Sequence, residues 1–189
     1  MRFLFSALLV LLVTVPVLSE PPAVTPFETG VSIALRLKNE GSLDLALTAY
    51  KVTLEFTDTL SASPMVTKAR EYFIISNIID IYEEISTYTK YMSYQALTTQ
   101  YGSYQDSLIY YYDAIIPLME QTKSIVKMPR SHLQDRYTKY ISILLANKRF
   151  EDTDIAKTKL DSTNNYPDPD VTYSDRLIIV SKIMAGLQP

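Results

Sequence analysis

Apolar side chains recur at steps of three or four residues through most of this 189-residue chain. That spacing lines one face of an α-helix, whereas a half-buried strand alternates apolar and polar residues. Glycine and proline interrupt regular structure, and here they gather at a few boundaries, with only 4 glycines in the chain. Long periodic stretches between these boundaries predict an all-α fold of about six to eight helices joined by short links.

The boundaries divide the chain into a series of predicted helices. Gly41 and Gly102 are each expected to end a helix, because glycine readily adopts the left-handed conformation at a helix C-terminus. Pro117 lacks a backbone donor, so a helix is expected to kink or end there. The predicted helical ranges are 27–39, 43–57, 65–99 (one bent helix or two), 103–117, 131–147, 151–160 and 172–187.

Three consecutive tyrosines stand inside the stretch "QYGSYQDSLIYYYDAIIPLMEQTK", residues 100–123. Helical spacing turns Tyr111 and Tyr112 inward with Leu108, because all three fall on one stripe. Tyr110 is rotated off that stripe by about 100° and is expected to face outward. The triplet therefore indicates helix packing rather than a dedicated aromatic binding box. The candidate partner-binding residues are Tyr110, Tyr88, Tyr91 and Tyr94.

The N-terminal segment has the features of a secretory signal. Arg2 precedes a nearly unbroken apolar run over residues 3–15, and Val17 and Ser19 occupy the two positions that a signal peptidase reads. We therefore expect residues 1–19 to be a cleaved signal peptide. The protein would then be secreted or reside in the lumen of the secretory pathway.

An uncleaved membrane anchor is the alternative interpretation of this segment. A spanning helix needs about 20 apolar residues, and Pro16 and Glu20 cut the run short of that length. After the predicted signal peptide we expect a Pro-rich segment over residues 20–26 and a single all-helical domain over residues 27–189. The chain has no cysteine, so this domain must be held together by burial rather than by disulfides.

Three stretches resemble one another where the chain is expected to turn between helices. They run from Gly41 to Tyr50, from Gly102 to Tyr111 and from Lys148 to Thr153, with a turn residue, a large side chain and a small residue in that order. This pattern resembles the inter-helix turn of tetratricopeptide repeats. The resemblance implies stacked helical hairpins whose concave face binds a peptide or protein. The family's repeat length of about 34 residues and its leading tryptophan are absent.

Catalytic and metal-binding patterns are missing from the sequence. His132 is the only histidine, and its place near a predicted helix start indicates a surface or capping role. Asp80 and Glu84 lie one helical turn apart, but carboxylates at that spacing more often mark a solvated edge than an acid–base pair. The loop over residues 161–170 offers carboxylates but lacks the ligand spacing of an EF-hand. We expect no enzyme activity, no cofactor and no metal.

These observations leave three functional interpretations. The first is a secreted or lumenal, non-catalytic helical protein that presents a Tyr-rich surface to a protein or peptide partner. The second is a helical carrier that encloses an apolar small molecule between its helices. The third is a signal-anchored accessory subunit of a membrane assembly. Nucleic acid is not an expected partner, because the net charge is −3 and no basic stripe occurs.

Overall fold

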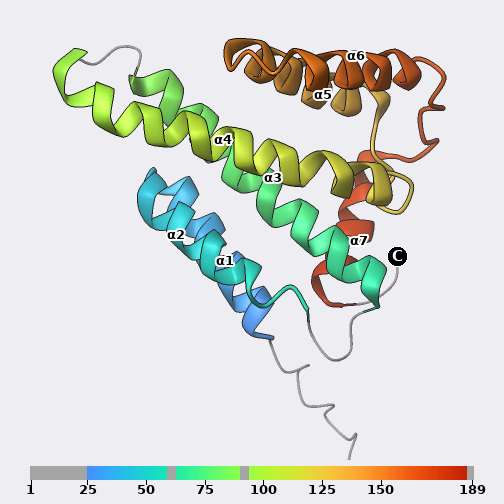
Figure 1. The fold of residues 1–189 in the computed structure, drawn as a ribbon. Coiled ribbons are helices and arrows are strands. Elements are labelled where there is room, and N and C mark those ends of the chain that lie inside the picture. The colour runs from blue at the N-terminus through green and yellow to red at the C-terminus, as the bar shows by residue number, and fades with distance from the viewer. Residues whose placement is uncertain (1–24, 59–62, 90–93, 187–189) are drawn as a thin grey trace, which may run out of the picture.

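A computed structural model describes residues 25–58, 63–89 and 94–186, without the side chains of residues 88, 89 and 94–105 (Figure 1). The predicted signal peptide and the candidate Tyr91 lie outside the described residues. Within the described ranges all regular structure is helical, which confirms the all-α prediction. The helices are α1 (Pro26–Asn39), α2 (Leu43–Leu54), α3 (Pro64–Thr89), α4 (Tyr94–Thr122), α5 (Arg130–Ala146), α6 (Phe150–Thr163) and α7 (Tyr173–Met184).

Consecutive helices pair into hairpins, α1 with α2, α3 with α4 and α5 with α6. The α3–α4 hairpin lies between the other two, with α2 packed on α3 and α4 packed on α5 (Figure 1). The last helix, α7, contacts α3 instead of extending the series beyond α6. None of the helices in the described ranges has the length and apolar character needed to cross a membrane.

The turns within the first and third hairpins share one backbone geometry. Gly41 and Lys148 both have positive φ, 76° and 57°. The amide after each of them donates to a carbonyl five residues earlier, Ser42 to Leu37 and Arg149 to Leu144, both at 2.9 Å. This is the Schellman arrangement that ends many helices. Lys148 therefore takes the conformation that glycine takes in the first turn.

The small residues predicted at these turns are buried, but the large side chain of the last turn is not. Ala46 and Thr153 are buried at the starts of α2 and α6, and Ala34 is buried on the facing side of α1. Phe150, expected to fill the space between paired helices, is 62% exposed. That part of the prediction is wrong, because Phe150 is the first residue of α6 and lies off the face that α6 buries.

The predicted helix end at Gly102 is wrong, since Gly102 lies inside α4. A single glycine in a helix costs only about 1 kcal/mol relative to alanine. The apolar stripe that begins at Leu108 also contains Tyr112, Ile115 and Met119, and all four are buried. The free energy gained by burying them is larger than the cost of one glycine in the helix. The range 65–99 contains α3 from its second residue onward and the start of α4, so it belongs to two helices.

Helix α4 also continues past Pro117, so the proline does not end it. The missing donor costs one backbone hydrogen bond, but Met119 and Thr122 beyond it are both buried. At the other end of the chain, α1 begins at Pro26 with a capping box between Thr25 and Glu28. The last residue of the predicted Pro-rich segment therefore belongs to the first helix.

Some apolar residues at helical spacing lie on exposed faces of their helices. Ile33 of α1 is 42% exposed, whereas α1 buries Phe27, Val31 and Ala34. Leu177 and Ile178 of α7 are exposed, and Ile183 is the residue that α7 buries. Helical periodicity identifies which residues share a face of a helix. Which of two adjacent faces is buried depends on where the neighbouring helix packs.

A buried arginine fastens α7 to the rest of the domain. Arg70 of α3 donates from Nε to the carbonyl of Ile183 at 3.0 Å and from Nη2 to the carbonyl of Met184 at 2.7 Å. Its Nη1 reaches the carbonyl of Thr57 at 3.5 Å, and its guanidinium lies 4.4 Å from the ring centroid of Phe27. The last carbonyls of a helix lack partners within the helix, so a cation satisfies them well.

Candidate functional site

Tyr110 is the predicted candidate residue whose side chain the structure describes. It is 68% exposed, whereas Leu108, Tyr111 and Tyr112 on the same helix are buried. The predicted division of the tyrosine triplet is therefore confirmed. Burial raises the pKa of Tyr111, as expected for a phenol held away from water.

A hollow of about 530 Å³ lies beside Tyr110, between α2 and α4. Lys51 of α2 and Asp106 of α4 bring opposite charges to it, and Ser107 adds a hydroxyl. The lining residues are Lys51, Asp106, Ser107, Tyr110 and Tyr111. This combination of a phenol ring and both charge signs suits the side chains of a peptide.

The exposed ring rests on a packed aromatic base. The rings of Tyr110 and Tyr111 meet edge to face with centroids 5.1 Å apart, and Tyr111 lies 5.8 Å from Tyr82 of α3. Lys51 donates from Nζ to the hydroxyl of Tyr82 at 3.0 Å. The base therefore joins α2, α3 and α4. Tyr110 is held by these contacts before any partner arrives.

Two other candidate tyrosines, Tyr88 and Tyr94, lie at the far end of the α3–α4 hairpin. Tyr88 belongs to the last turn of α3 and Tyr94 begins α4, but their side chains are outside the described part of the chain. Tyr110 lies sixteen residues after Tyr94 on α4, roughly 24 Å along the helix axis. Tyr94 and Tyr110 therefore do not form one compact site.

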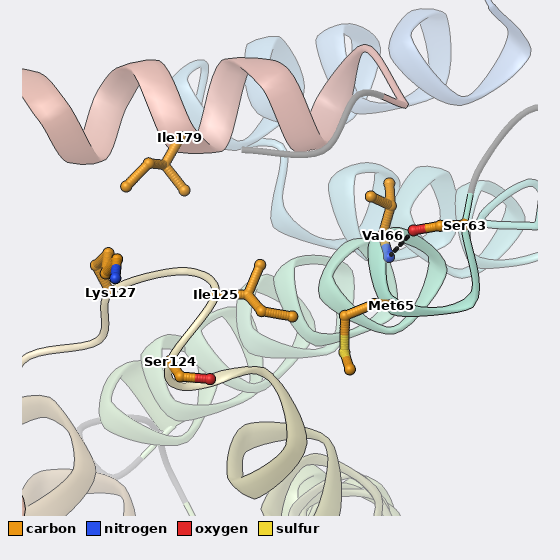
Figure 2. Close-up of a pocket in the computed structure, with 7 residues that line it drawn as sticks. All are labelled: Ser63, Met65, Val66, Ser124, Ile125, Lys127 and Ile179. Atoms are coloured by element: carbon orange, nitrogen blue, oxygen red, sulfur yellow. Dashed lines mark hydrogen bonds between the residues drawn. The ribbon is translucent and has the colours of Figure 1, made fainter.

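A second hollow, of about 360 Å³, is built from three segments far apart in the sequence. Figure 2 shows Ile179 pointing from α7 toward the α4–α5 connection, with the first turn of α3 beside them. The Oγ of Ser63 accepts a hydrogen bond from the amide of Val66 at 3.3 Å. The lining residues are Ser63, Met65, Val66, Ser124, Ile125, Lys127 and Ile179. No sequence pattern indicated this hollow, because no segment supplies more than three of its side chains, and α7 supplies one.

His132 does not have the surface role predicted for it. It is half-buried on α5, and its Nε2 lies 2.7 Å from the hydroxyl of the buried Tyr72 on α3. Burial lowers the pKa of His132, and the nearby Arg136 lowers it further. Burial raises the pKa of Tyr72 to about 12. Both side chains are therefore neutral near pH 7, and their contact joins α3 to α5.

Asp80, one of the two carboxylates of the predicted pair on α3, and its neighbour Glu83 are engaged by cations of α5. The buried Arg136 donates from Nη2 to Asp80 and to Ser76, each at 2.7 Å. Glu83 accepts from Lys139 at 2.9 Å and from the hydroxyl of Tyr112. The expectation of a plain solvated edge is therefore wrong for Asp80. Helical spacing along one element cannot report a partner that lies on another helix.

No potential metal centre is present in the ranges that the structure describes, where no three His, Asp or Glu side chains gather as ligands. In the acidic loop, Asp168 accepts a hydrogen bond from the amide of Arg130 at 2.7 Å.

Comparisons with protein-family models, curated proteins and solved structures found no match for this chain. Functional inference therefore rests on the two hollows and on the exposed tyrosines.

Proposed function

We propose that this protein is a secreted or lumenal, non-catalytic interaction protein that binds a protein or peptide partner at the Tyr110 hollow. One observation carries the proposal: a single ring of the tyrosine triplet, 68% exposed, stands on a packed aromatic base beside a hollow. Tyrosine is enriched among the residues that dominate binding energy, because it buries a large area while ordering few rotatable bonds.

The packing around Tyr110 favours binding. A ring already held by Tyr111 loses little conformational freedom when a partner covers it. Lys51 and Asp106 lie on opposite helices of the hollow, so a partner can pair with one charge or both. We propose that the partner contributes an apolar side chain to the ring, with polar groups on either side.

The arrangement of the hairpins supports a short repeat array of the tetratricopeptide type. Three hairpins follow one another in chain order, and two of their turns share the left-handed geometry at Gly41 and Lys148. Stacked hairpins form continuous surfaces across unit boundaries. The Tyr110 hollow lies at one such boundary, between α2 of the first hairpin and α4 of the second.

Selection of peptides from a random display library tests this function. Peptides are selected on the chain from residue 20 onward, and dissociation constants are measured by calorimetry for the unaltered chain and two variants. Tyr110→Ala should weaken binding at least about tenfold, as the loss of an interface anchor does. Tyr173→Ala is the matched control, since Tyr173 is 75% exposed on α7 and does not line the hollow. Equal affinity for all three proteins would refute the assignment.

Secretion is tested separately from binding. Expression of the full chain in cells with a secretory pathway should release a protein whose N-terminus is Glu20 or within a few residues of it. Mass spectrometry of the released protein measures this directly. Recovery of the intact chain in the membrane fraction would support the anchored alternative.

A carrier of an apolar small molecule is the second candidate function, favoured by the hollow in Figure 2. Met65, Val66, Ile125 and Ile179 give it an apolar lining, and about 360 Å³ falls within the roughly 300–1,000 Å³ of ligand pockets. Titration with a fluorescent fatty acid should show saturable binding that Ile179→Glu abolishes. Binding unchanged by Ile179→Glu, or no binding, would exclude this hollow as the carrier site.

A further inference from the structure

Two tyrosines are exposed among those whose side chains the structure describes, Tyr110 and Tyr173. Tyr173 is the more exposed of the two, at 75%, and it is the first residue of α7. It directly follows the loop that joins α6 to α7, whereas Tyr110 lies deep within α4. Among the tyrosines whose side chains are described, Tyr173 is therefore the phenol that another protein's active site reaches most easily.

The chain around Tyr173 is acidic and interrupted by proline. Arg176 is the one basic residue between Leu160 and Ser181, and its Nε is buried. Pro167 and Pro169 stand in the loop before α7 and exclude helix there. The acidic residues of this segment are Asp161, Asp168, Asp170 and Asp175. Tyr173 thus stands in a segment where acidic residues outnumber the one basic residue, and the loop before it contacts α5 through the hydrogen bond from the amide of Arg130 to Asp168.

The first turn of α7 can open without disturbing the core. Every residue from 172 to 175 is exposed, and the turn is held by the capping box between Thr172 and Asp175. The opposite end of α7 is fastened by the buried Ile183 and by Arg70. Helix ends fray at little free-energy cost when they bury nothing. The segment around Tyr173 can therefore enter an enzyme cleft as an extended strand.

We propose that Tyr173 is a site of tyrosine O-sulfation, an inference that rests on the proposed passage through the secretory pathway. The phenolic oxygen attacks the sulfur of an activated sulfate donor, a mixed anhydride of phosphate and sulfate. The bond from sulfur to the bridging oxygen breaks, and the phosphate leaves with that oxygen. A base of the transferase takes the phenolic proton, so the phenolic oxygen exchanges its hydrogen for a sulfonate group and becomes an aryl sulfate ester. An enzyme that binds such an anionic donor needs a basic cleft, which an acidic substrate segment complements.

The modification suits its place on the helix. A sulfate on Tyr173 adds negative charge at the N-terminus of α7, where the helix dipole and the free amides favour an anion. It also presents acceptor oxygens that an arginine or lysine of a partner can engage with charge-assisted hydrogen bonds. Sulfation would therefore create a second docking point without altering the packed core.

The other tyrosines near acidic residues serve as internal controls. Tyr166 lies in the same loop, but it is half-buried, and its hydroxyl donates to the carbonyl of Lys123 at 3.4 Å. The Nζ of Lys123 also lies 5.3 Å from the ring centroid of Tyr166. Tyr110 is exposed, but the residues around it are fixed within α4. Structure rather than local charge thus separates Tyr173 from both.

Transfer to the purified protein tests the inference without requiring secretion. The chain from residue 20 onward is incubated with purified tyrosylprotein sulfotransferase and the phosphosulfate donor, and peptides are examined by mass spectrometry. We expect the mass of one SO₃ on the peptide that contains Tyr173, with none on Tyr166 or Tyr110. Tyr173→Phe should abolish transfer. Asp170→Asn should slow it several-fold, because Asp170 is exposed and acidic three residues before the phenol.

The outcomes separate this inference from the proposed function. Absence of transfer, or equal transfer to Tyr166 and Tyr110, would overturn the assignment even if the protein is secreted. If Tyr173 is sulfated in vitro but the full chain is retained inside cells, both secretion and the modification in cells are overturned. Tyr173 would then still be the phenol that the transferase prefers. Protein recovered from the medium with Tyr173 sulfated, and with the group resistant to phosphatase, supports both.

Discussion

Replacing Arg70 with methionine should selectively loosen α7. Methionine keeps an unbranched apolar side chain at this position but removes the donors to Ile183 and Met184, the weaker contact with Thr57 and the cation–π contact with Phe27. Hydrogen bonds from charged donors contribute about 1.5–3 kcal/mol each, so the two short bonds set an upper limit of roughly 3–6 kcal/mol. Removing a buried cation also relieves its desolvation penalty. We therefore expect a net loss of about 2–4 kcal/mol in the free energy that holds α7 in place.

Two measurements show whether the loss is local. Urea unfolding followed by circular dichroism reports global stability, and amide hydrogen exchange reports the opening of α7 by itself. Because α7 otherwise buries a single residue, Ile183, exchange of its amides should accelerate more than that of α3. Arg36→Met is the matched control, since the side chain of Arg36 is 70% exposed and pairs with Glu40 at 3.9 Å. That variant should change stability by less than about 0.5 kcal/mol. If Arg70→Met behaves like Arg36→Met in both assays, Arg70 does not hold α7 in place.

Three further predictions test the core and the turns. Tyr111→Ala should lower the free energy of unfolding by about 3–5 kcal/mol because it leaves a cavity, whereas Tyr110→Ala should cost under about 1 kcal/mol; equal small losses in urea unfolding would contradict the buried stripe. Burial lowers the folded-state pKa of His132 from 6.5, so below that pH the unfolded chain binds a proton that the folded chain does not. Stability should therefore fall as pH drops below 6.5, and a His132→Gln variant with an unchanged pH profile would show that this group is not responsible. Lys148→Gly should raise the melting temperature, with a gain of about 0.5–1 kcal/mol from relieving the left-handed backbone; a fall in melting temperature would mean that the lysine side chain contributes more than the strain costs.

The parts of the structure that were predictable depend on residues close together in the chain. Helical periodicity placed α1, α2 and α5 within a residue or so of their observed starts, and it separated Tyr110 from Tyr111. Glycine's conformational freedom located the turn at Gly41. Each of these features follows from backbone geometry over one or two helical turns. Such geometry acts in the same way whatever the rest of the chain does.

The features that were missed depend on residues far apart in the sequence. Arg70 meets carbonyls more than a hundred residues away, and Arg136 meets Asp80 across two hairpins. Their partners are chosen by which helices pack together, and the spacing along one helix carries no record of that choice. Gly102 shows the same effect, because burial of the stripe that follows it outweighs its local preference to end a helix.

The sequence by itself therefore determined the helical class, most helix positions and the outward ring of the tyrosine triplet, since these need only local periodicity. The tertiary structure decided that Tyr110 borders a hollow with Lys51 and that α7 folds back on α3. It also decided that Tyr173, at the start of α7, is exposed, whereas Tyr166 in the acidic loop is half-buried. Accessibility and juxtaposition are properties of packed surfaces, and a surface exists only once distant segments have come together.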